Sequence, residues 1–362
     1  MKALMHQTYL REVLDKVVGV IKKNSLAGLE CVKLQVANGS VKATATDLNI
    51  WLRAETTCQT DEEGIVVVSG KELAEISKLL PEEDVSLETK DKQLVIKSNG
   101  SKFKLPLANP RDYPTEKPLP GSNGIYIPRT DLQSAMSSVS ALTGKETYSS
   151  VLSGTLFDFR KDKLILVGTD GHRLAEIGVS GEFEQEQKLV VPSDIAKHLR
   201  KMEAHTIKVL VDKTMIGFSS GNLKVVSRLL EGQFPDYEKV IPDDNDKLMI
   251  VGRENLIQGL RQVEVFAQKA NELAKLKIDK GATEFAMTSA AEGCESVVRV
   301  ECKYSGSSIE IGFNAKYLLE IVSAIKGEQV KWSFKSPVSP MILKPDNSEN
   351  EHLYLLMPVR ME

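Results

Sequence analysis

Hydrophobic residues recur at helical spacing in three stretches of similar length that lie far apart in the chain. In the first stretch, 8–24, apolar residues lie three and four positions apart from Leu10 to Val17. The same spacing recurs in 130–144 and in 254–269. Apolar residues at this period share one face of a helix. We therefore predict three amphipathic helices, each of which packs its apolar face on the rest of its domain.

Each predicted helix is followed by two strand-like runs that a polar turn joins. The runs occupy 32–47, 154–170 and 274–289. Their turns are Asn38-Gly39, Lys161-Asp162 and Lys280-Gly281. Apolar and polar residues alternate most clearly in the first two runs, as in hairpins with one buried face.

The ends of these hairpins show that the pattern is a repeat. They are Thr46-Asp47, Thr169-Asp170 and Thr288-Ser289, so that successive hairpins end 123 and 119 residues apart. A second helix follows in each repeat, at 71–80, 193–202 and 314–326. Ser69, Ser193 and Asn314 are the predicted N-cap residues of these helices. With the further strands that come after them, each repeat has two helices and about eight strands.

Proline-rich segments separate the repeats. The first is 108–124 and the second is 231–246, and in each an aromatic residue lies near Asp and Pro. Such segments are typical of linkers between domains. We predict an α+β protein with three similar domains at 1–123, 124–246 and 247–362, each with two helices packed on antiparallel sheets.

Charge and cysteine content narrow the possible functions. The 47 Lys and Arg are offset by 50 Asp and Glu, and the net charge of −3 lacks the basic excess of most nucleic-acid-binding proteins. A DNA-binding protein of this composition must therefore separate its charges in space. The four cysteines form no CxxC pair, and no stretch is apolar enough to span a bilayer, so we expect a cytosolic protein without a metal site or cofactor.

Three short motifs carry a resemblance to a known family. They are TDGHRLA at 169–175, FPDYEKVIP at 234–242 and YLLMPVR at 354–360. With the order and length of the repeats, they make the whole chain similar to the bacterial beta clamps, the beta subunits of DNA polymerase III. The resemblance implies three domains of the DNA-clamp type, and two chains joined head to tail in a ring around duplex DNA. It also implies a processivity factor that catalyses no reaction.

The resemblance further implies a hydrophobic pocket for short peptide motifs of partner proteins. Expected partners are the polymerase III alpha subunit, the clamp loader, other DNA polymerases and repair proteins. The expected pocket residues are Leu152, Thr169, Gly171, His172, Arg173, Leu174, Pro235, Lys239, Val240, Pro340, Leu355, Met357, Pro358, Val359 and Arg360. Lys239 stands where the family often has Arg, and it lacks the planar fork of a guanidinium.

Two further surfaces follow from the resemblance. Basic residues in or beside the helices are expected to face DNA: Lys22, Lys23, Lys78, Lys145, Lys197, Arg200 and Lys201. The head-to-tail joint is expected to contain Phe103 and Leu105 of the first domain and Val265 and Phe266 of the third. A solvated helix face is the alternative for the lysines, and core packing is the alternative for the apolar residues.

Two other functions remain open at this point. Asp170 and His172 could belong to a hydrolase, with Ser149, Ser150 or Ser153 near them in the sequence. No GxSxG, P-loop or HExxH motif accompanies them, and Thr-Asp recurs in the first repeat without His or Arg, which favours a structural turn. An oligomeric peptide-binding scaffold is the other alternative.

Overall fold

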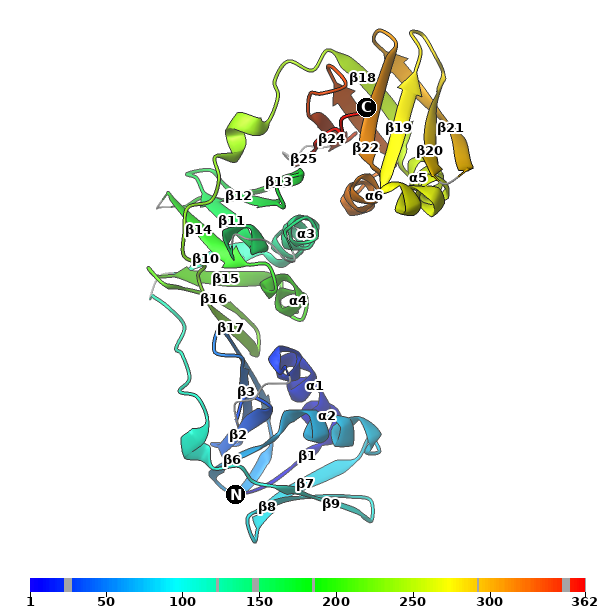
Figure 1. Cartoon of the computed structure of the whole chain (residues 1–362). Helices are drawn as coiled ribbons and strands as arrows, with labels where there is room; N and C mark the ends of the chain where they lie inside the picture. The colour runs from blue at the N-terminus through cyan, green and yellow to red at the C-terminus, as the bar shows by residue number, and fades with distance from the viewer. Residues whose placement is uncertain are drawn as a thin grey trace. The chain divides into compact units, whose positions relative to one another are not determined.

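The computed structural model describes residues 1–22, 28–121, 124–144, 150–183, 186–291, 293–346 and 352–361. Lys23, Lys145 and Ser149 lie outside the described residues, and so does the side chain of Ser150. The chain forms two compact units, drawn in Figure 1. Unit 1 consists of Met1–Leu132 and Asp194–Leu229, and unit 2 consists of Gln133–Ser193 and Leu230–Glu362. The middle repeat therefore contributes to both units.

Unit 1 contains two antiparallel sheets. The five-stranded sheet has the order β5 (Gln59–Glu62), β1 (Lys2–His6), β7 (Asp84–Lys90), β8 (Gln93–Ser98) and β9 (Ser101–Pro106). The eight-stranded sheet has the order β10 (Ile125–Pro128), β15 (Thr206–Val211), β16 (Met215–Ser220), β17 (Leu223–Arg228), β4 (Ile50–Thr57), β3 (Ser40–Thr46), β2 (Cys31–Ala37) and β6 (Gly64–Ser69). The pairing of β17 with β4, which aligns Leu223 with Ala54, joins the middle repeat to the first.

The helices of unit 1 cover its sheets with their apolar faces. They are α1 (Gln7–Val17), continued by the short η1 (Val18–Val20), then α2 (Gly70–Leu79), η2 (Pro110–Asp112) and α4 (Ile195–Leu199). Helix α1 packs on β3 and β4 and lies beside α2 (Figure 1). Leu10, Val13 and Leu14 of α1 are completely buried, which confirms the predicted apolar face.

Unit 2 is built on one antiparallel sheet of twelve strands. In order these are β14 (Gln187–Pro192), β11 (Gly154–Phe159), β12 (Lys163–Thr169), β13 (Arg173–Ser180), β25 (His352–Leu356), β24 (Met341–Pro345), β23 (Gln329–Phe334), β18 (Lys247–Gly252), β21 (Cys294–Ser305), β20 (Glu284–Ala291), β19 (Leu273–Ile278) and β22 (Ile309–Asn314). The pairing of β13 with β25 joins the middle repeat to the third.

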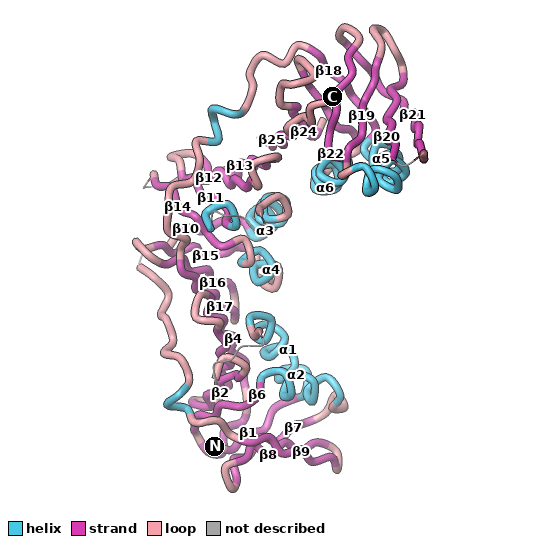
Figure 2. Tube along the Cα trace, viewed as in Figure 1, coloured by secondary structure: helices cyan, strands magenta, loops and turns pink. Residues whose placement is uncertain are grey.

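The remaining helices are α3 (Arg129–Ser140), α5 (Arg253–Ala267), α6 (Ala315–Ala324) and the short η3 (Ser150–Ser153), η4 (Tyr237–Val240) and η5 (Gln268–Ala270). Helix α5 packs against α6 and on strands β20 and β21. Figure 2 colours the strands magenta and the helices cyan along the described chain, and strands are the more numerous elements there. Each predicted repeat contains two α-helices and eight or nine strands among the described residues, which confirms the predicted architecture.

Local signals in the sequence were mostly correct. Asn38 and Gly39 form a two-residue hairpin turn between β2 and β3, and both have positive φ. Ser69 caps α2 by accepting a hydrogen bond from the N–H of Glu72, and Asn314 caps α6 in the same way. The prediction for Ser193 was wrong.

Helix α4 begins after Asp194, whose side chain makes no capping hydrogen bond. The Ser193 hydroxyl lies 3.2 Å from that of Thr155 instead. The helix is also shorter than predicted, because Lys201 and Met202 donate their N–H groups three residues back, to His198 and Leu199. Such bonds tighten and end a helix.

Each linker is anchored to a strand by one tyrosine. The hydroxyl of Tyr113 donates to the carbonyl of Thr44 at 2.7 Å, and that of Tyr237 donates to Asp158 Oδ2 at 3.2 Å. Burial raises the pKa of both phenols, which remain protonated donors at neutral pH. The aromatic residues noted in the linker sequences therefore tie the linkers down.

None of the helices in the described part of the chain is long and apolar enough to span a membrane.

Gly168 of β12 provides a test of the packing between α3 and the sheet. A Cβ at this position would lie 2.6 Å from the carbonyl oxygen of Val139, whereas a Cβ at Gly252 would meet nothing closer than 3.5 Å. We expect Gly168→Ala to lower the free energy of unfolding by about 1–3 kcal/mol. Gly252→Ala, the matched control, should change it by less than about 1 kcal/mol, since Gly252 is the N-cap of α5 and alanine is a poorer cap than glycine. Urea unfolding of both variants measures the difference, and equal midpoints would contradict the close approach.

Candidate functional site

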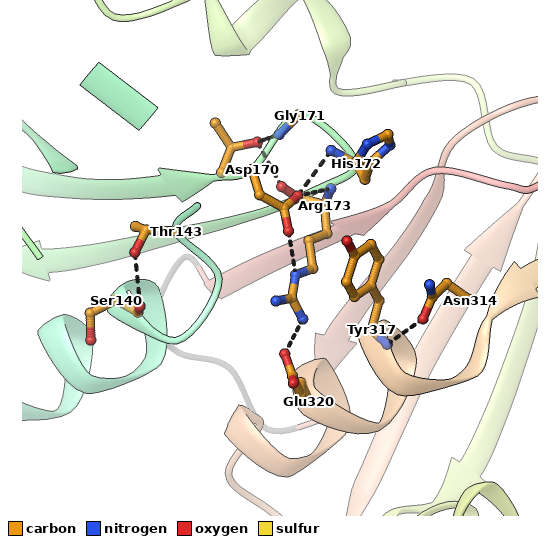
Figure 3. Close-up of polar contacts among 10 residues, drawn as sticks. Ser140, Thr143, Asp170, Gly171, His172, Arg173, Asn314, Tyr317 and Glu320 are labelled. Carbon is orange, nitrogen blue, oxygen red and sulfur yellow. Dashed lines mark hydrogen bonds and ion pairs between the residues drawn. The ribbon is translucent and has the colours of Figure 1, made fainter. Parts of the chain in front are cut away.

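The motif TDGHR forms a tight turn between β12 and β13. The hydroxyl of Thr169 accepts the N–H of Gly171 at 3.1 Å and donates to the carbonyl of Arg173 at 2.6 Å. Asp170 Oδ1 accepts the N–H groups of His172 and Arg173 at 3.0 and 3.1 Å (Figure 3). Gly171 has φ of +89°, a conformation that favours glycine. The Thr-Asp pair thus satisfies the backbone of the turn.

The first repeat contains the same turn. Thr46 Oγ1 accepts the N–H of Leu48, and Asp47 Oδ1 accepts the N–H groups of Asn49 and Ile50. Leu48 adopts φ of +73° where the second repeat has glycine. The third repeat departs from this plan, since Ser289 donates its hydroxyl to the carbonyl of Leu273. Recurrence in the first repeat confirms that Thr-Asp is a structural turn.

Two carboxylates hold the guanidinium of Arg173. Its Nε donates to Asp170 Oδ2 at 2.9 Å, and its Nη1 donates to Glu320 Oε2 of α6 at 2.5 Å. Its Cζ lies 4.3 Å from the ring centre of Tyr317, which is also on α6 (Figure 3). Arg173 is only 6% exposed. Because its charge is paired inside the protein, Arg173 braces the turn of the second repeat against a helix of the third.

Tyr317 is a residue of this site that the sequence did not reveal. Its ring stacks on His172 with the ring centres 6.3 Å apart, and its N–H is capped by Asn314. Burial, followed by the nearby Asp170, raises the pKa of Tyr317. The sequence shows that Tyr317 lies three residues after Asn314, the predicted N-cap. Only the fold brings its ring beside His172.

Strand pairing brings the motifs TDGHRLA and YLLMPVR together. Strands β13 and β25 align Leu174 with Leu355. Beyond β25, the N–H of Met357 donates to the carbonyl of His172 at 2.9 Å. The N–H of Val359 then donates to the carbonyl of Gly312 at 2.8 Å. Residues from opposite ends of nearly 200 residues of chain therefore form one surface.

A hydrophobic cluster lies beneath this surface. Leu174 and Leu355 belong to it at 2% exposure each, together with Phe234 and Tyr237 from the linker, and Leu152 packs against it partly exposed. Leu174 and Leu355 are therefore core residues in this chain. The exposed apolar side chains nearby are Val240 at 45% and Met357 and Val359 at 37% each. We call Leu152, His172, Val240, Met357 and Val359 the peptide surface.

The other expected pocket residues differ in exposure. Pro235 and Arg360 are exposed, and Pro358 and Pro340 are half-buried. Lys239 is 81% exposed and pairs with Asp236 at 2.8 Å, so its charge is directed into solvent. The carbonyl of Pro340, just before β24, accepts a hydrogen bond from Asn245, and this residue is the least clearly connected to the others.

A buried carboxylate holds the linker that carries Pro235 and Val240. Asp158 is 3% exposed and accepts hydrogen bonds from Tyr237 and from Nε and Nη2 of Arg160. Arg160 also donates to Glu238 at 2.5 Å. This network fixes η4 against β11, and with it the position of Val240.

The basic residues expected to face DNA are mostly paired with acids of unit 1. Lys22 lies 3.3 Å from Asp47, and Lys197 lies 3.1 Å from Asp194. Lys78 lies 3.1 Å from Asp15. Lys201 donates to the backbone carbonyl of Asp15 and is partly buried, while Arg200 is exposed.

His198 adds no charge to these basic residues at neutral pH. It is 1% exposed, and burial, followed by the neighbouring Lys197 and Lys201, lowers its pKa to about 4. Its imidazole is therefore neutral under physiological conditions.

The residues expected at the dimer joint occupy an edge strand and a helix end. Phe103 and Leu105 lie on β9, the last strand of its sheet, and Leu105 is only 6% exposed, as a core residue would be. Val265, 59% exposed, and the half-buried Phe266 lie in the last turn of α5. Residues 294–301 of β21 pair only with β20 among the described strands, so one side of this segment is also an open edge.

Comparison with known proteins identifies the family. Sequence models of the DNA polymerase III beta subunit match three consecutive parts of the chain: its N-terminal domain at 1–117, its central domain at 126–236 and its C-terminal domain at 238–360. Together they leave only short gaps. The chain belongs to the family of the DNA polymerase III beta subunit.

Relatives and solved structures agree over the full length. The beta sliding clamp of Pseudomonas putida is 29% identical over 370 residues, covering 99% of this chain and all of the relative. That of Escherichia coli is 25% identical over 369 residues with both chains fully covered. The crystal structure of the DNA polymerase III subunit beta from Pseudomonas aeruginosa matches with a TM-score of 0.94 and 25% identity, and it also covers both chains completely. The sliding clamp of Bacillus subtilis, at 22% identity and a TM-score of 0.94, shares the fold.

Membership in this family decides between the functions left open by the sequence. Beta subunits are processivity clamps without catalytic activity, so the chain is not an enzyme. The geometry agrees, because Asp170 is engaged by the turn and by Arg173, and among the described contacts none joins it to the ring of His172. No group of three or more His, Cys, Asp or Glu in the described residues could hold a metal ion.

Substitutions of Asp170 test its role in the turn. Asp170→Asn keeps an acceptor for the two backbone N–H groups but loses the charge that pairs with Arg173. Asp170→Ala loses both. We expect urea unfolding to show a loss of about 1–3 kcal/mol for the alanine variant and roughly half of it for the asparagine variant. Equal losses would mean that the turn does not depend on the acceptor at Oδ1.

Proposed function

We infer that this chain is a DNA sliding clamp, a processivity factor that works as a ring-shaped homodimer around duplex DNA and tethers DNA polymerase to its template. The observation that carries the function is the consecutive match of all three beta-subunit domains. Backbone hydrogen bonds between strands join the middle repeat to each of its neighbours, β17 with β4 in unit 1 and β13 with β25 in unit 2.

A clamp of this kind acts through topology. A closed ring cannot leave a DNA circle by diffusing sideways, so its contacts with phosphates need not be strong. A polymerase bound to the ring remains at a high effective concentration near its template and rebinds before it diffuses away. The number of nucleotides added per binding event therefore rises although the clamp performs no chemistry.

Retention on DNA tests the function directly. The chain should remain on nicked circular DNA through gel filtration after it has been loaded, and it should be lost once the circle is cut. Phosphate contacts alone would depend steeply on salt and little on linearisation. Loss from closed and linear DNA at the same rate would contradict the ring.

We further propose that the peptide surface binds short linear motifs of the polymerase III alpha subunit, the clamp loader, other DNA polymerases and repair proteins. The exposed side chain of Met357 can adapt to different partners, since Met is flexible and polarisable. The bonds that hold Met357 and Val359 to the turn and to β22 support this, because they pre-form the surface before a partner arrives.

Met357 is the residue that best tests peptide binding, since Leu174 lies in the core and its removal would disturb the fold. We expect Met357→Ala to weaken binding of a polymerase-derived peptide by about 1–2 kcal/mol, roughly tenfold. Ile65→Ala, at a residue of β6 in unit 1 that is 49% exposed, is the matched control. Calorimetric titration measures both, and the peptide surface is wrong if both variants bind like the parent.

We propose that the dimer forms between the β9 end of one chain and the α5–β21 end of another. Both ends carry open strand edges, which pair readily with another strand, and the α5–β21 end also carries the exposed Val265 and Val297. The charges of the two open edges also differ in sign: β9 carries Lys102 and Lys104, whereas residues 294–301 of β21 carry Glu295 and Glu301 with one Arg299, which pairs with Glu284.

A charge at this joint should separate the subunits. Val265→Asp places a carboxylate on a side chain that is 59% exposed, so the monomer should still fold. We expect the dissociation constant of the dimer to rise by at least tenfold, in line with a loss of 1.4 kcal/mol or more. Val338→Asp is the control. Sedimentation analysis measures the mass, and an undisturbed Val265→Asp dimer would move the interface elsewhere.

The domain limits 1–123, 124–246 and 247–362 and the cytosolic location stay predictions, and limited proteolysis and cell fractionation test them.

A further inference from the structure

The helices of unit 1 carry a basic face whose cations are held by acidic side chains. We use the term basic helix face for Arg11, Lys22, Lys78, Lys197, Arg200 and Lys201. Of these six residues, Lys201 bonds to a backbone carbonyl, Arg200 has no ion pair within the described residues, and the other four lie within 4 Å of a carboxylate. The face therefore presents fewer available charges than its sequence suggests.

Asp15 of α1 lies at the centre of these contacts. Its Oδ1 is 3.1 Å from Lys78 Nζ of α2, and its Oδ2 is 3.7 Å from Arg11 Nε. Its backbone carbonyl accepts a hydrogen bond from Lys201, just beyond α4. Basic residues of α1, of α2 and of the segment after α4 thus converge on one acidic residue.

Exposure shows that these cations are within reach of a ligand. The side chain of Asp15 is 39% exposed, and those of Arg11 and Lys78 are 49% and 51% exposed. Exposed ion pairs contribute only about 0–1 kcal/mol, so a phosphate can compete for either cation. Asp15 lowers the free energy gained when a phosphate binds Arg11 or Lys78, because the cation must first leave the carboxylate of Asp15.

A contribution to helix stability alone does not account for this arrangement. Arg11 and Asp15 are four residues apart on α1, and such a pair supports a helix by about 0.3–0.5 kcal/mol. Lys78, however, comes from a different helix, and it makes the shorter of the two contacts. The convergence follows from the packing of α1 on α2.

We propose that Asp15 is an intramolecular competitor for DNA phosphates, which holds Lys78 and Arg11 and thereby keeps the contact between clamp and duplex weak enough for sliding. This role rests on the proposed function, since it requires the basic helix face to meet DNA. It assigns an acidic residue, not a basic one, to the control of DNA contact.

The test compares Asp15→Asn with Asp91→Asn. Both variants change the net charge by the same amount, and Asp91 lies in the exposed turn after β7, at the end of that strand remote from α1. Its φ of +50° suits asparagine. Fluorescence anisotropy with a short labelled duplex gives the binding constant of each variant over a salt series.

We expect Asp15→Asn to bind the duplex about 3–10 times more tightly than the parent at low salt. The slope of log K against log salt should become steeper by about 1–2, because each freed cation that meets a phosphate releases about 0.9 counterion. Asp91→Asn should leave the slope unchanged. Equal slopes for the two variants would overturn the proposal.

A second background tests whether Asp15 acts through Lys78. In a Lys78→Gln chain, Asp15→Asn should change the slope of log K against log salt by about half as much or less. The reason is that Lys78, one of the two cations that Asp15 pairs with, is gone. An undiminished effect would assign the change to net charge alone and would also overturn the proposal. Single-molecule tracking of loaded clamps should show slower diffusion of Asp15→Asn along DNA.

Failure of this inference is distinguishable from failure of the proposed function. If the parent chain is not retained on closed circular DNA, the clamp function itself is wrong. If the parent is retained but Asp15→Asn behaves like Asp91→Asn in binding and diffusion, only the role of Asp15 is wrong.

Discussion

Antiparallel strand pairing across the boundaries between repeats is the interaction on which the rest of this structure depends. Strand β17 pairs with β4, and β13 pairs with β25, so backbone hydrogen bonds join the middle repeat to both of its neighbours. Paired edges leave no free donors or acceptors at these joints and need no particular side chain. Repeats of low sequence similarity can therefore be joined in the same way. Two of the strand edges that remain open, at β9 and in part of β21, are where we propose that a second chain pairs.

The peptide surface is a consequence of one of these joints. Because β13 and β25 are aligned in register, the turn at 169–173 and the segment after β25 meet at the same end of the sheet. Arg173 extends this connection from the sheet to α6 through Glu320 and Tyr317. The buried network of Asp158, Arg160 and Tyr237 adds the linker. A partner would thus meet a surface whose backbone is already ordered, which reduces the entropy lost on binding.

The near-neutral charge of the chain has a structural counterpart. A clamp must attract DNA and yet move along it, and each phosphate contact that it makes strengthens attachment and its salt dependence. Pairing of Lys78 with Asp15, and of Lys197 with Asp194, keeps basic residues present while limiting their pull on a phosphate. The composition that first argued against DNA binding is consistent with a protein that holds DNA by enclosing it.

The sequence alone determined the repeat, the two helices of each domain, the Asn38-Gly39 turn and the caps at Ser69 and Asn314, because these depend on residues close together in the chain. It also indicated that Thr-Asp forms a turn, since the pair recurs without His and Arg. Only the tertiary structure decided which side chains share a surface. It buried Leu174 and Leu355 in the core, brought Tyr317 and Glu320 to Arg173, and paired Lys78 of α2 with Asp15 of α1. It also shortened α4: the sequence pattern predicted a helix from Ser193 to Met202, but only Ile195–Leu199 is helical. The spacing of apolar residues predicts which face of a helix or strand is buried. Which other element packs on that face depends on strand register and helix packing between residues more than a hundred positions apart, and no local sequence pattern encodes this.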